Sequence, residues 1–273
     1  MNLRSYLRPF LRRAVAAVAV ASLPLSAFAA ADANSFALVN HAGRNIGKAS
    51  YTITKTKDGY KVTTHFQYRA GISGDATVAA DDPTKTTANS GATVTDYQYS
   101  GEYKIADDGS FLSGFTQNSA NQILSSFQPN KTRSLVTVGQ IQGGVNLGSR
   151  DIELPKPWFL LAPDYDPSAI QLLLTAAAAH PHSDSTYLFL VPASGSGPKA
   201  LNTPLFVTLQ PLSDTPAGTL DGKPVTLKHI QMNYHAGKAD LYVDDAGNLM
   251  QADMGTLSAS YIRTKFVLTP AAQ

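Results

Sequence analysis

The chain has 273 residues, of which 43% are hydrophobic, and it contains no cysteine. Its 22 basic and 20 acidic residues give a net charge of +2. The absence of cysteine excludes disulfide bonds, a thiol nucleophile and lipid attachment through a cysteine thiol.

The first 29 residues have the features of a secretory signal peptide. Four arginines precede an apolar run (residues 14–25), and the sequence SAFA at residues 26–29 has the small-x-small pattern of a cleavage site. The apolar run is shorter than the roughly 20 residues that span a bilayer. We expect cleavage after Ala29, with the mature chain in the periplasm or secreted and without a membrane span.

Removal of this leader changes the charge of the protein. Without its four arginines, residues 30–273 carry 18 basic and 20 acidic residues, a net charge of −2. Nucleic-acid binding needs a basic face that displaces counterions from phosphates, so a weakly acidic chain with scattered charges disfavours it. The remaining 244 residues suffice for a single domain with a large core.

Alternation with period two indicates β-strands through most of the mature chain. Residues 60–69 (YKVTTHFQYR) place Tyr60 and Phe66 on one face and His65 on the other, as a strand with one solvated side requires. Residues 48–55 (KASYTITK) alternate in the same way. The intervening KDG supplies a glycine for the turn, so the two segments are predicted to form a hairpin.

The next alternating segment, residues 93–105 (TVTDYQYSGEYKI), puts Tyr97 and Tyr99 on one face. It follows a long polar loop, residues 71–91, which we interpret as either a mobile excursion or a flap over the sheet. Further alternating segments separated by turn residues bring the total to eleven or twelve candidate strands.

A single helix is predicted over residues 167–180. Asp166 is a suitable N-cap, and Ile170, Leu173 and Leu174 follow at helical spacing. The other side of this helix is also apolar, which is typical of a buried helix. The sequence therefore predicts a mainly β fold, with a large curved antiparallel sheet (half-barrel) wrapped around one central α-helix.

Trp158 and Phe159 lie just before this helix, in a segment with prolines on both sides. An aromatic side chain there can line a ligand pocket. Packing of Trp158 under the end of the helix is the simpler interpretation, because a tryptophan buries a large apolar area.

The segment DDAGN (residues 244–248) raises the question of a metal-binding loop. An EF-hand calcium loop needs a glycine at its sixth position and a closing glutamate at its twelfth, and DDAGNLMQADMG has neither. Strand-like residues stand on both sides. We therefore predict a hairpin turn in which Gly247 takes a positive φ. Asn248 is a further candidate for a positive φ in this turn.

His180 and His182, together with Asp184, form the best metal-binding pattern in the chain, because a His-x-His spacing can place two imidazoles on one ion. The alternative is a polar exit from the helix, since further ligands are not evident. The chain also lacks the Gly-x-Ser-x-Gly motif of serine hydrolases. No cofactor, catalytic residue or metal is predicted.

A resemblance to a known group of proteins rests on the helix sequence DPSAIQLLL and on the C-terminal run GKPVTLKHIQMNYHAGKADLYVDDAGNLMQADM. The run resembles the closing strands of bacterial periplasmic half-β-barrel proteins, similar to the lipoprotein-localisation carriers and to related envelope families of unknown function. The resemblance covers residues 47–128 and 204–268. It implies a half-barrel whose hollow, between sheet and helix, accepts acyl chains.

Three functional hypotheses follow from these observations. The first is noncatalytic binding of an apolar or lipid-like ligand in the hollow between sheet and helix. The second is a structural or partner-binding envelope protein, and the third is a hydrolase or metal enzyme that uses His180 and His182. The residues expected to contact the ligand of the first hypothesis are Trp158, Phe159, Ile170, Leu173, Leu174, Tyr97, Tyr99 and Phe66.

Overall fold

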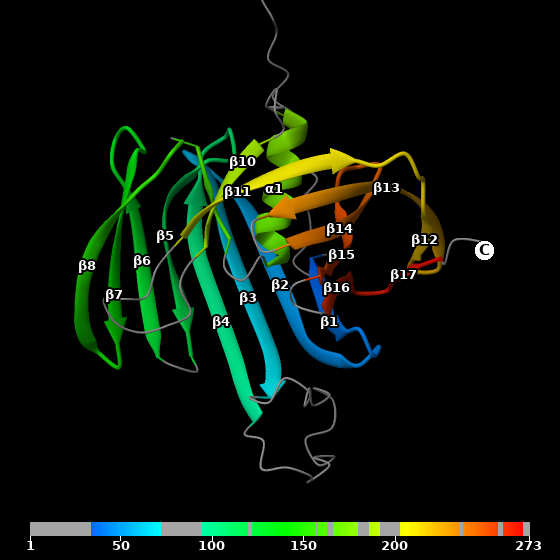
Figure 1. Ribbon diagram of the computed structural model, residues 1–273, viewed down its shortest axis with the longest axis horizontal. Helices are drawn as coiled ribbons and strands as arrows, with labels where there is room; N and C mark the ends of the chain where they lie inside the picture. The colour runs from blue at the N-terminus through cyan, green and yellow to red at the C-terminus, as the bar shows by residue number, and fades with distance from the viewer. Residues whose placement is uncertain are drawn as a thin grey trace, which may run out of the picture.

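The computed structural model describes residues 34–71, 94–119, 122–156, 158–162, 166–179, 186–191, 203–234, 237–255 and 259–269. These residues form a sheet of 17 strands and one helix (Figure 1). The elements are β1 (Ser35–Asn40), β2 (Asn45–Thr56), β3 (Gly59–Gly71), β4 (Val94–Ile105), β5 (Phe111–Asn118), β6 (Ile123–Pro129), β7 (Leu135–Gln142), β8 (Val145–Glu153), β9 (Leu160–Leu161), α1 (Pro167–Ala179), β10 (Thr186–Val191), β11 (Thr203–Pro211), β12 (Ala217–Leu220), β13 (Lys223–Tyr234), β14 (Gly237–Asp244), β15 (Leu249–Met254), β16 (Ala259–Arg263) and β17 (Phe266–Leu268).

The strands form one continuous series of ladders. β1 lies between β2 and β16. From β2 the series runs through consecutive strands to β8, and from β16 it runs back through β15, β14, β13, β11 and β10 to β9. β12 pairs with the start of β13 and with β17.

The sheet is not closed by its ladders, and it is mixed. Within the described residues, β8 pairs only with β7 and β9 pairs only with β10, the latter in parallel. One backbone hydrogen bond lies near this gap, where the Phe111 N–H donates to the Phe159 carbonyl oxygen at 3.0 Å. The predicted mainly β fold with one helix is confirmed. The prediction of a wholly antiparallel sheet is wrong, because β9 and β10 pair in parallel.

Several strands were missed by the sequence pattern, which predicted eleven or twelve. β8 is exposed along most of its length and therefore has no apolar alternation. β9 has only two residues, and both are buried. Residues 258–268 (SASYIRTKFVL) alternate as one strand in the sequence, but a turn in which Lys265 has a φ of 66° divides them into β16 and β17.

Alternation sets the two faces of the long N-terminal strands. Tyr51 of β2, Val62 of β3 and Tyr103 of β4 are buried and belong to the main core. Lys61 and Glu102 lie on the opposite face, where they form an ion pair at 2.8 Å. The predicted hairpin of β2 and β3 is confirmed, with Gly59 of its turn at a φ of 130°.

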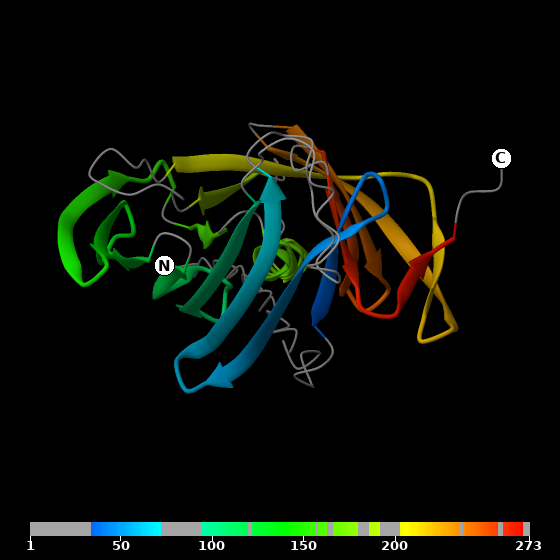
Figure 2. The same ribbon diagram turned by 90° about the horizontal axis from the view of Figure 1, so that it is seen from below.

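The helix α1 spans Pro167–Ala179, as predicted up to its last residue, and position 180 lies outside the described residues. It contacts β2, β9 and β15, and nine of its 13 residues are buried, so its apolar side chains have no solvated face along most of its length. Figure 2 shows α1 end-on with strands on several sides. Half-barrel wrapping stays a prediction.

A second, smaller cluster packs on the opposite face of the C-terminal strands. Leu227 of β13, Met250 of β15 and Phe266 of β17 are its buried members, and Leu220 of β12 packs against them. The C-terminal strands therefore bury apolar side chains on both faces.

The predicted signal peptide lies outside the described residues. In the part of the chain that the structure describes, no helix combines the length and apolar character needed to cross a bilayer.

Candidate functional site

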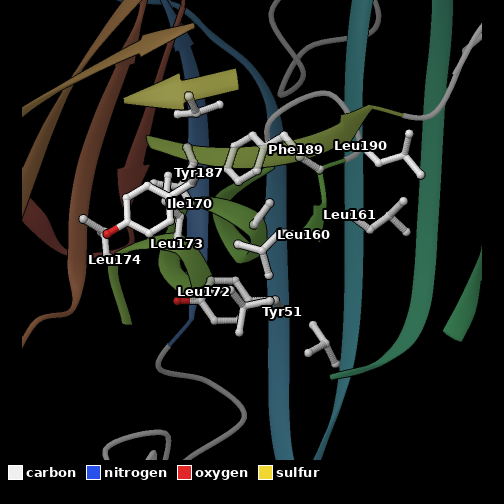
Figure 3. Close-up of a cluster of buried hydrophobic side chains, with 14 of the residues drawn as sticks. Tyr51, Leu160, Leu161, Ile170, Leu172, Leu173, Leu174, Tyr187, Phe189 and Leu190 are labelled. Atoms are coloured by element: carbon white, nitrogen blue, oxygen red, sulfur yellow. The ribbon is translucent and has the colours of Figure 1, made fainter. Parts of the chain in front are cut away.

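The predicted contact residues next to the helix are buried in the main core. Phe159, Ile170 and Leu173 are fully buried and Leu174 is nearly so. Figure 3 shows the helix side chains packed with Leu160, Tyr187 and Phe189. The region predicted as a hollow is therefore lined by side chains that are already in contact with protein atoms.

Trp158 lies at the border of this core. It is partly buried, and its ring packs edge-on against Tyr187 with 5.7 Å between ring centroids. Its indole Nε1–H donates to the Asp108 carbonyl oxygen at 3.3 Å. Trp158 thus packs against Tyr187 of β10 and joins the segment before β9 to the β4–β5 turn.

A buried polar network holds the N-terminus of α1 in the sheet. Asp166 is fully buried; its Oδ1 accepts hydrogen bonds from the Ser168 hydroxyl (2.5 Å) and the Ala169 N–H (3.0 Å). Its Oδ2 accepts a hydrogen bond from Thr64 of β3 at 3.0 Å, and Ser168 bonds Tyr103 of β4 at 2.7 Å. Burial raises the pKa of Asp166, although these hydrogen bonds oppose the shift.

Gln171 connects the helix to the turn of residues 244–248. Its Nε2 donates to the Gly247 carbonyl at 2.9 Å, and its Oε1 accepts from the Leu249 N–H at 2.8 Å. Within the turn, Asp244 accepts from the Asn248 backbone N–H at 2.7 Å and Gly247 has a φ of 85°. The predicted hairpin turn is confirmed, with the positive φ at Gly247 and not at Asn248.

A hollow lies across β1 to β5 and has a volume of about 770 Å³. We call it the β1–β5 groove. Its polar side chains form a row in ladder register, one from each strand: Ser35, Ser50, His65, Ser100 and Gln117. Because facing residues in a ladder point to the same side of a sheet, this row lies on the face away from α1.

A second row runs parallel to the first. Ala37, Lys48, Gln67 and Gln98 are paired in register on β1 to β4, and all line the groove. A further hollow of about 240 Å³ shares Lys48 and Gln67 with the groove and extends it along β2 and β3. Within the described part of the chain, neither hollow has a carboxylate among its lining residues.

Two of the predicted contact residues, Phe66 and Tyr99, border the groove. They face each other in the ladder of β3 and β4 and occupy positions alternate to His65 and Ser100. Phe66 points into the core, where its ring lies 6.0 Å from that of Tyr261, so it reaches the groove through its backbone. Tyr97 is on β4, but its side chain lies outside the described part of the chain.

The structure therefore divides the predicted contact residues between two places. Phe159, Ile170, Leu173 and Leu174 lie in the core around α1, with Trp158 at its border. Phe66 and Tyr99 lie in the sheet that separates this core from the groove.

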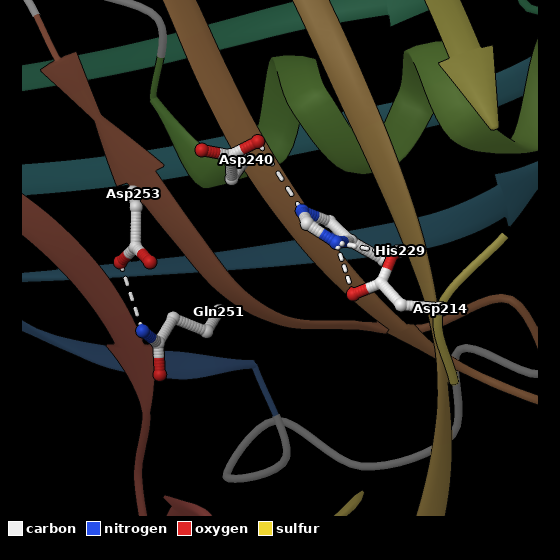
Figure 4. A network of polar contacts seen from close by, with 5 residues as sticks. All are labelled: Asp214, His229, Asp240, Gln251 and Asp253. Atoms are coloured by element: carbon white, nitrogen blue, oxygen red, sulfur yellow. Dashed lines mark hydrogen bonds and ion pairs between the residues drawn. The ribbon is translucent and has the colours of Figure 1, made fainter. Parts of the chain in front are cut away.

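A second polar cluster surrounds His229 on the outer face of β13 and β14 (Figure 4). Its Nδ1 lies 2.7 Å from Asp214 Oδ2, and its Nε2 lies 3.2 Å from Asp240 Oδ1. The imidazole stacks on Tyr242 with 4.8 Å between centroids. Burial raises the pKa of Tyr242, and the carboxylates of Asp253, Asp240 and Asp214 add to this shift.

This arrangement fits an anchor better than a catalytic base. Both ring nitrogens of His229 are already in contact with carboxylates of the protein, Asp214 on one side and Asp240 on the other. The described residues contain no group of three or more His, Cys, Asp or Glu side chains placed to hold a metal ion.

The metal-binding pattern that the sequence offered lies outside the described residues; it consists of His180, His182 and Asp184. The groove was not predicted from the sequence, because its polar side chains are spread over five strands and nothing in their local spacing connects them. The partners of His229 were not predicted either, since Asp214 is in a loop and only the register of β13 and β14 brings Asp240 close. The alternation of polar residues at 48, 50, 65 and 67 was the available signal for the groove.

The chain has no match among protein-family models or curated proteins. Among solved structures it is similar to a β-barrel-like protein of domain of unknown function DUF1849 from Brucella abortus. That alignment has a TM-score of 0.46 and 11% identity and covers 87% of this chain and 97% of the other. A DUF1089 family protein from Pseudomonas aeruginosa gives a TM-score of 0.38 and 10% identity, over 74% and 87% of the two chains. These distant similarities carry no argument about function.

Proposed function

We propose that this chain is an exported, noncatalytic binding protein of the cell envelope, and that its ligand site is the β1–β5 groove. The observation that carries the proposal is a hollow of about 770 Å³, because ligand-binding pockets typically measure roughly 300–1,000 Å³. The export part rests on the signal-peptide pattern of the first 29 residues.

The groove is a better site than the space around α1. A ligand beside the helix has to displace Ile170, Leu173 and their neighbours, which are fully buried in protein contacts. Opening such a core forfeits about 2–5 kcal/mol for each large apolar side chain that loses its packing. A ligand in the groove displaces only water.

An apolar or lipid-like ligand in the hollow of a half-barrel is the second candidate. Its support is the helix itself, which is apolar on nearly all sides and contacts β2, β9 and β15. It requires α1 to move, with Trp158 and Phe159 moving at its entry. The resemblance of the sequence to the lipoprotein-localisation carriers favours this second candidate, because those carriers accept acyl chains in such a hollow. The structural or partner-binding role and the metal-enzyme role of His180 and His182 are further hypotheses.

The binding proposal is tested by filling the groove. Wild-type protein and a Ser100→Trp variant are incubated with an extract of bacterial envelope, and retained compounds are identified by native mass spectrometry. We expect the wild type to retain a compound that the variant loses, because Ser100 lies within the polar row, between His65 and Gln117. Equal retention by both proteins would contradict the groove as the site.

Ser113→Trp is the matched control. Ser113 lies opposite Lys104 on the same face of the same sheet, but outside the groove lining. This variant carries the same substitution as the test variant and should retain the compound.

Cleavage of the signal peptide is tested on the exported protein. Mass spectrometry identifies its N-terminal residue, and a first residue other than Ala30 would contradict the predicted cleavage site.

A further inference from the structure

We propose that the β1–β5 groove recognises an acidic oligosaccharide, a polyhydroxylated chain that carries a carboxylate or phosphate. This inference rests on the proposed binding function and names the ligand class of the same site. It is carried by two properties of the groove, namely the chemistry of the side chains that face it and the sign of its charge.

The side chains that face the groove suit hydroxyl groups. Serine hydroxyls and glutamine amides each donate and accept hydrogen bonds, so they match sugar hydroxyls, which do the same. Ser50, Ser100 and Gln117 stand in the first row, and Gln67 and Gln98 in the second. Neighbouring strands are about 4.8 Å apart, so each row repeats polar groups at that interval across the sheet.

The charge of the groove selects an anion. Lys48 lies where the two hollows meet, and among the residues that the structure describes no Asp or Glu lines either of them. Arg69 also lines the smaller hollow, and Lys48 is the basic residue common to both hollows. A carboxylate or phosphate of the ligand placed at Lys48 gains a charge-assisted hydrogen bond.

The same features disfavour two other ligand classes. An acyl chain needs an apolar wall, and Ala37 is the only apolar residue in the two rows that face the groove. An extended peptide adds to a sheet through a free strand edge. The strands β2 to β4 under the groove are each paired on both sides, so they offer no such edge.

The test uses matched pairs of oligosaccharides. Each uronic-acid oligosaccharide is compared with its carboxyl-reduced counterpart, which has the same length and linkage but no charge. Binding to the mature protein is measured by isothermal titration calorimetry over a panel of linkages. We expect acidic members to bind about fivefold more tightly than their neutral partners, the upper range for an exposed ion pair, because Lys48 is exposed.

Two variants separate charge from shape. Lys48→Gln should abolish the difference between acidic and neutral partners while retaining binding, and Ser100→Trp should abolish both. Circular dichroism and unfolding midpoints like those of the wild type show that each variant is folded. A panel with no bound oligosaccharide, or with no preference for acidic members, would overturn the proposal.

The failure of this inference is distinguishable from failure of the binding function. If the wild type retains a compound from envelope extract that is not a carbohydrate, and Ser100→Trp loses it, the ligand class is wrong and the binding site stands. If neither protein retains a compound and no oligosaccharide binds, both proposals are wrong.

Discussion

Asp166 shows how a single residue joins the helix to the sheet. Its carboxylate caps α1 through the Ala169 N–H and binds Thr64 of β3, while Ser168 links it to Tyr103 of β4. A carboxylate with no solvent exposure is retained at a cost in free energy, because burial disfavours its charged form. The hydrogen bonds offset part of that cost.

We predict that Asp166 makes the folded protein less stable as pH rises. Burial raises its folded-state pKa above the ordinary value of 3.8, so between the two values the folded state binds more protons than the unfolded state. The free energy of unfolding then decreases with pH through that window. Asp166→Asn keeps an N-cap side chain and should lose this decrease, which urea unfolding across acidic and neutral pH would measure. Parallel stability curves for the two proteins would contradict the prediction.

At the scale of elements, the loop between β11 and β12 is anchored on β13 and β14 by His229. Asp214 supplies the loop end of this contact, and Asp240 lies on the other side of the ring. The anchor stands beside the small cluster of Leu227, Met250 and Phe266, which holds β12 and β17 on the sheet. The polar contact and the apolar cluster therefore attach the same part of the chain.

A double-mutant cycle tests this anchor. His229→Phe keeps the stacking on Tyr242 and removes both carboxylate contacts, and Asp214→Asn removes one charge. The side chain of Asp214 is 58% exposed, so we expect a coupling of less than about 1 kcal/mol in the free energy of unfolding, and a smaller one in high salt. Strictly additive effects of the two substitutions would show that the contact does not stabilise the fold.

At the scale of the whole molecule, β1 connects the two halves of the sheet. It pairs with β2 on one side and with β16 on the other, although β16 is more than 200 residues away in the chain. Phe36 and Leu38 of β1 are buried in the main core. Removal of β1 would therefore open two strand edges and expose the core between them.

We predict that a chain that begins at Arg44, without β1, is much less stable than one that begins at Asn34. Two large apolar side chains lost from the core account for roughly 3–6 kcal/mol, before the loss of two ladders is added. Thermal unfolding and light scattering would show a lower midpoint and aggregation for the shorter chain. Similar midpoints would contradict the role of β1 as the central connection.

The accuracy of prediction from sequence depended on how local each feature is. The hairpin of β2 and β3, the turn at Gly247 and the start of α1 were predicted, because alternation, turn glycines and an N-cap act within a few residues. β8 was missed because both of its faces are largely solvated, and β9 because two residues show no period. The groove was missed because it is a property of five strands together.

By itself, the sequence determined that this is a mainly β protein with one buried helix, since the period of apolar residues fixes which side chains can leave water together. Only the tertiary structure decided which strands are neighbours. Strand register placed Ser50, His65 and Ser100 side by side in a groove, and the packing of α1 against β2, β9 and β15 placed Ile170 and Leu173 in a packed core instead of an open hollow. Ladder hydrogen bonds form between backbone groups that are alike at every residue, so pairing is selected by the packing of the whole sheet and not by any one segment.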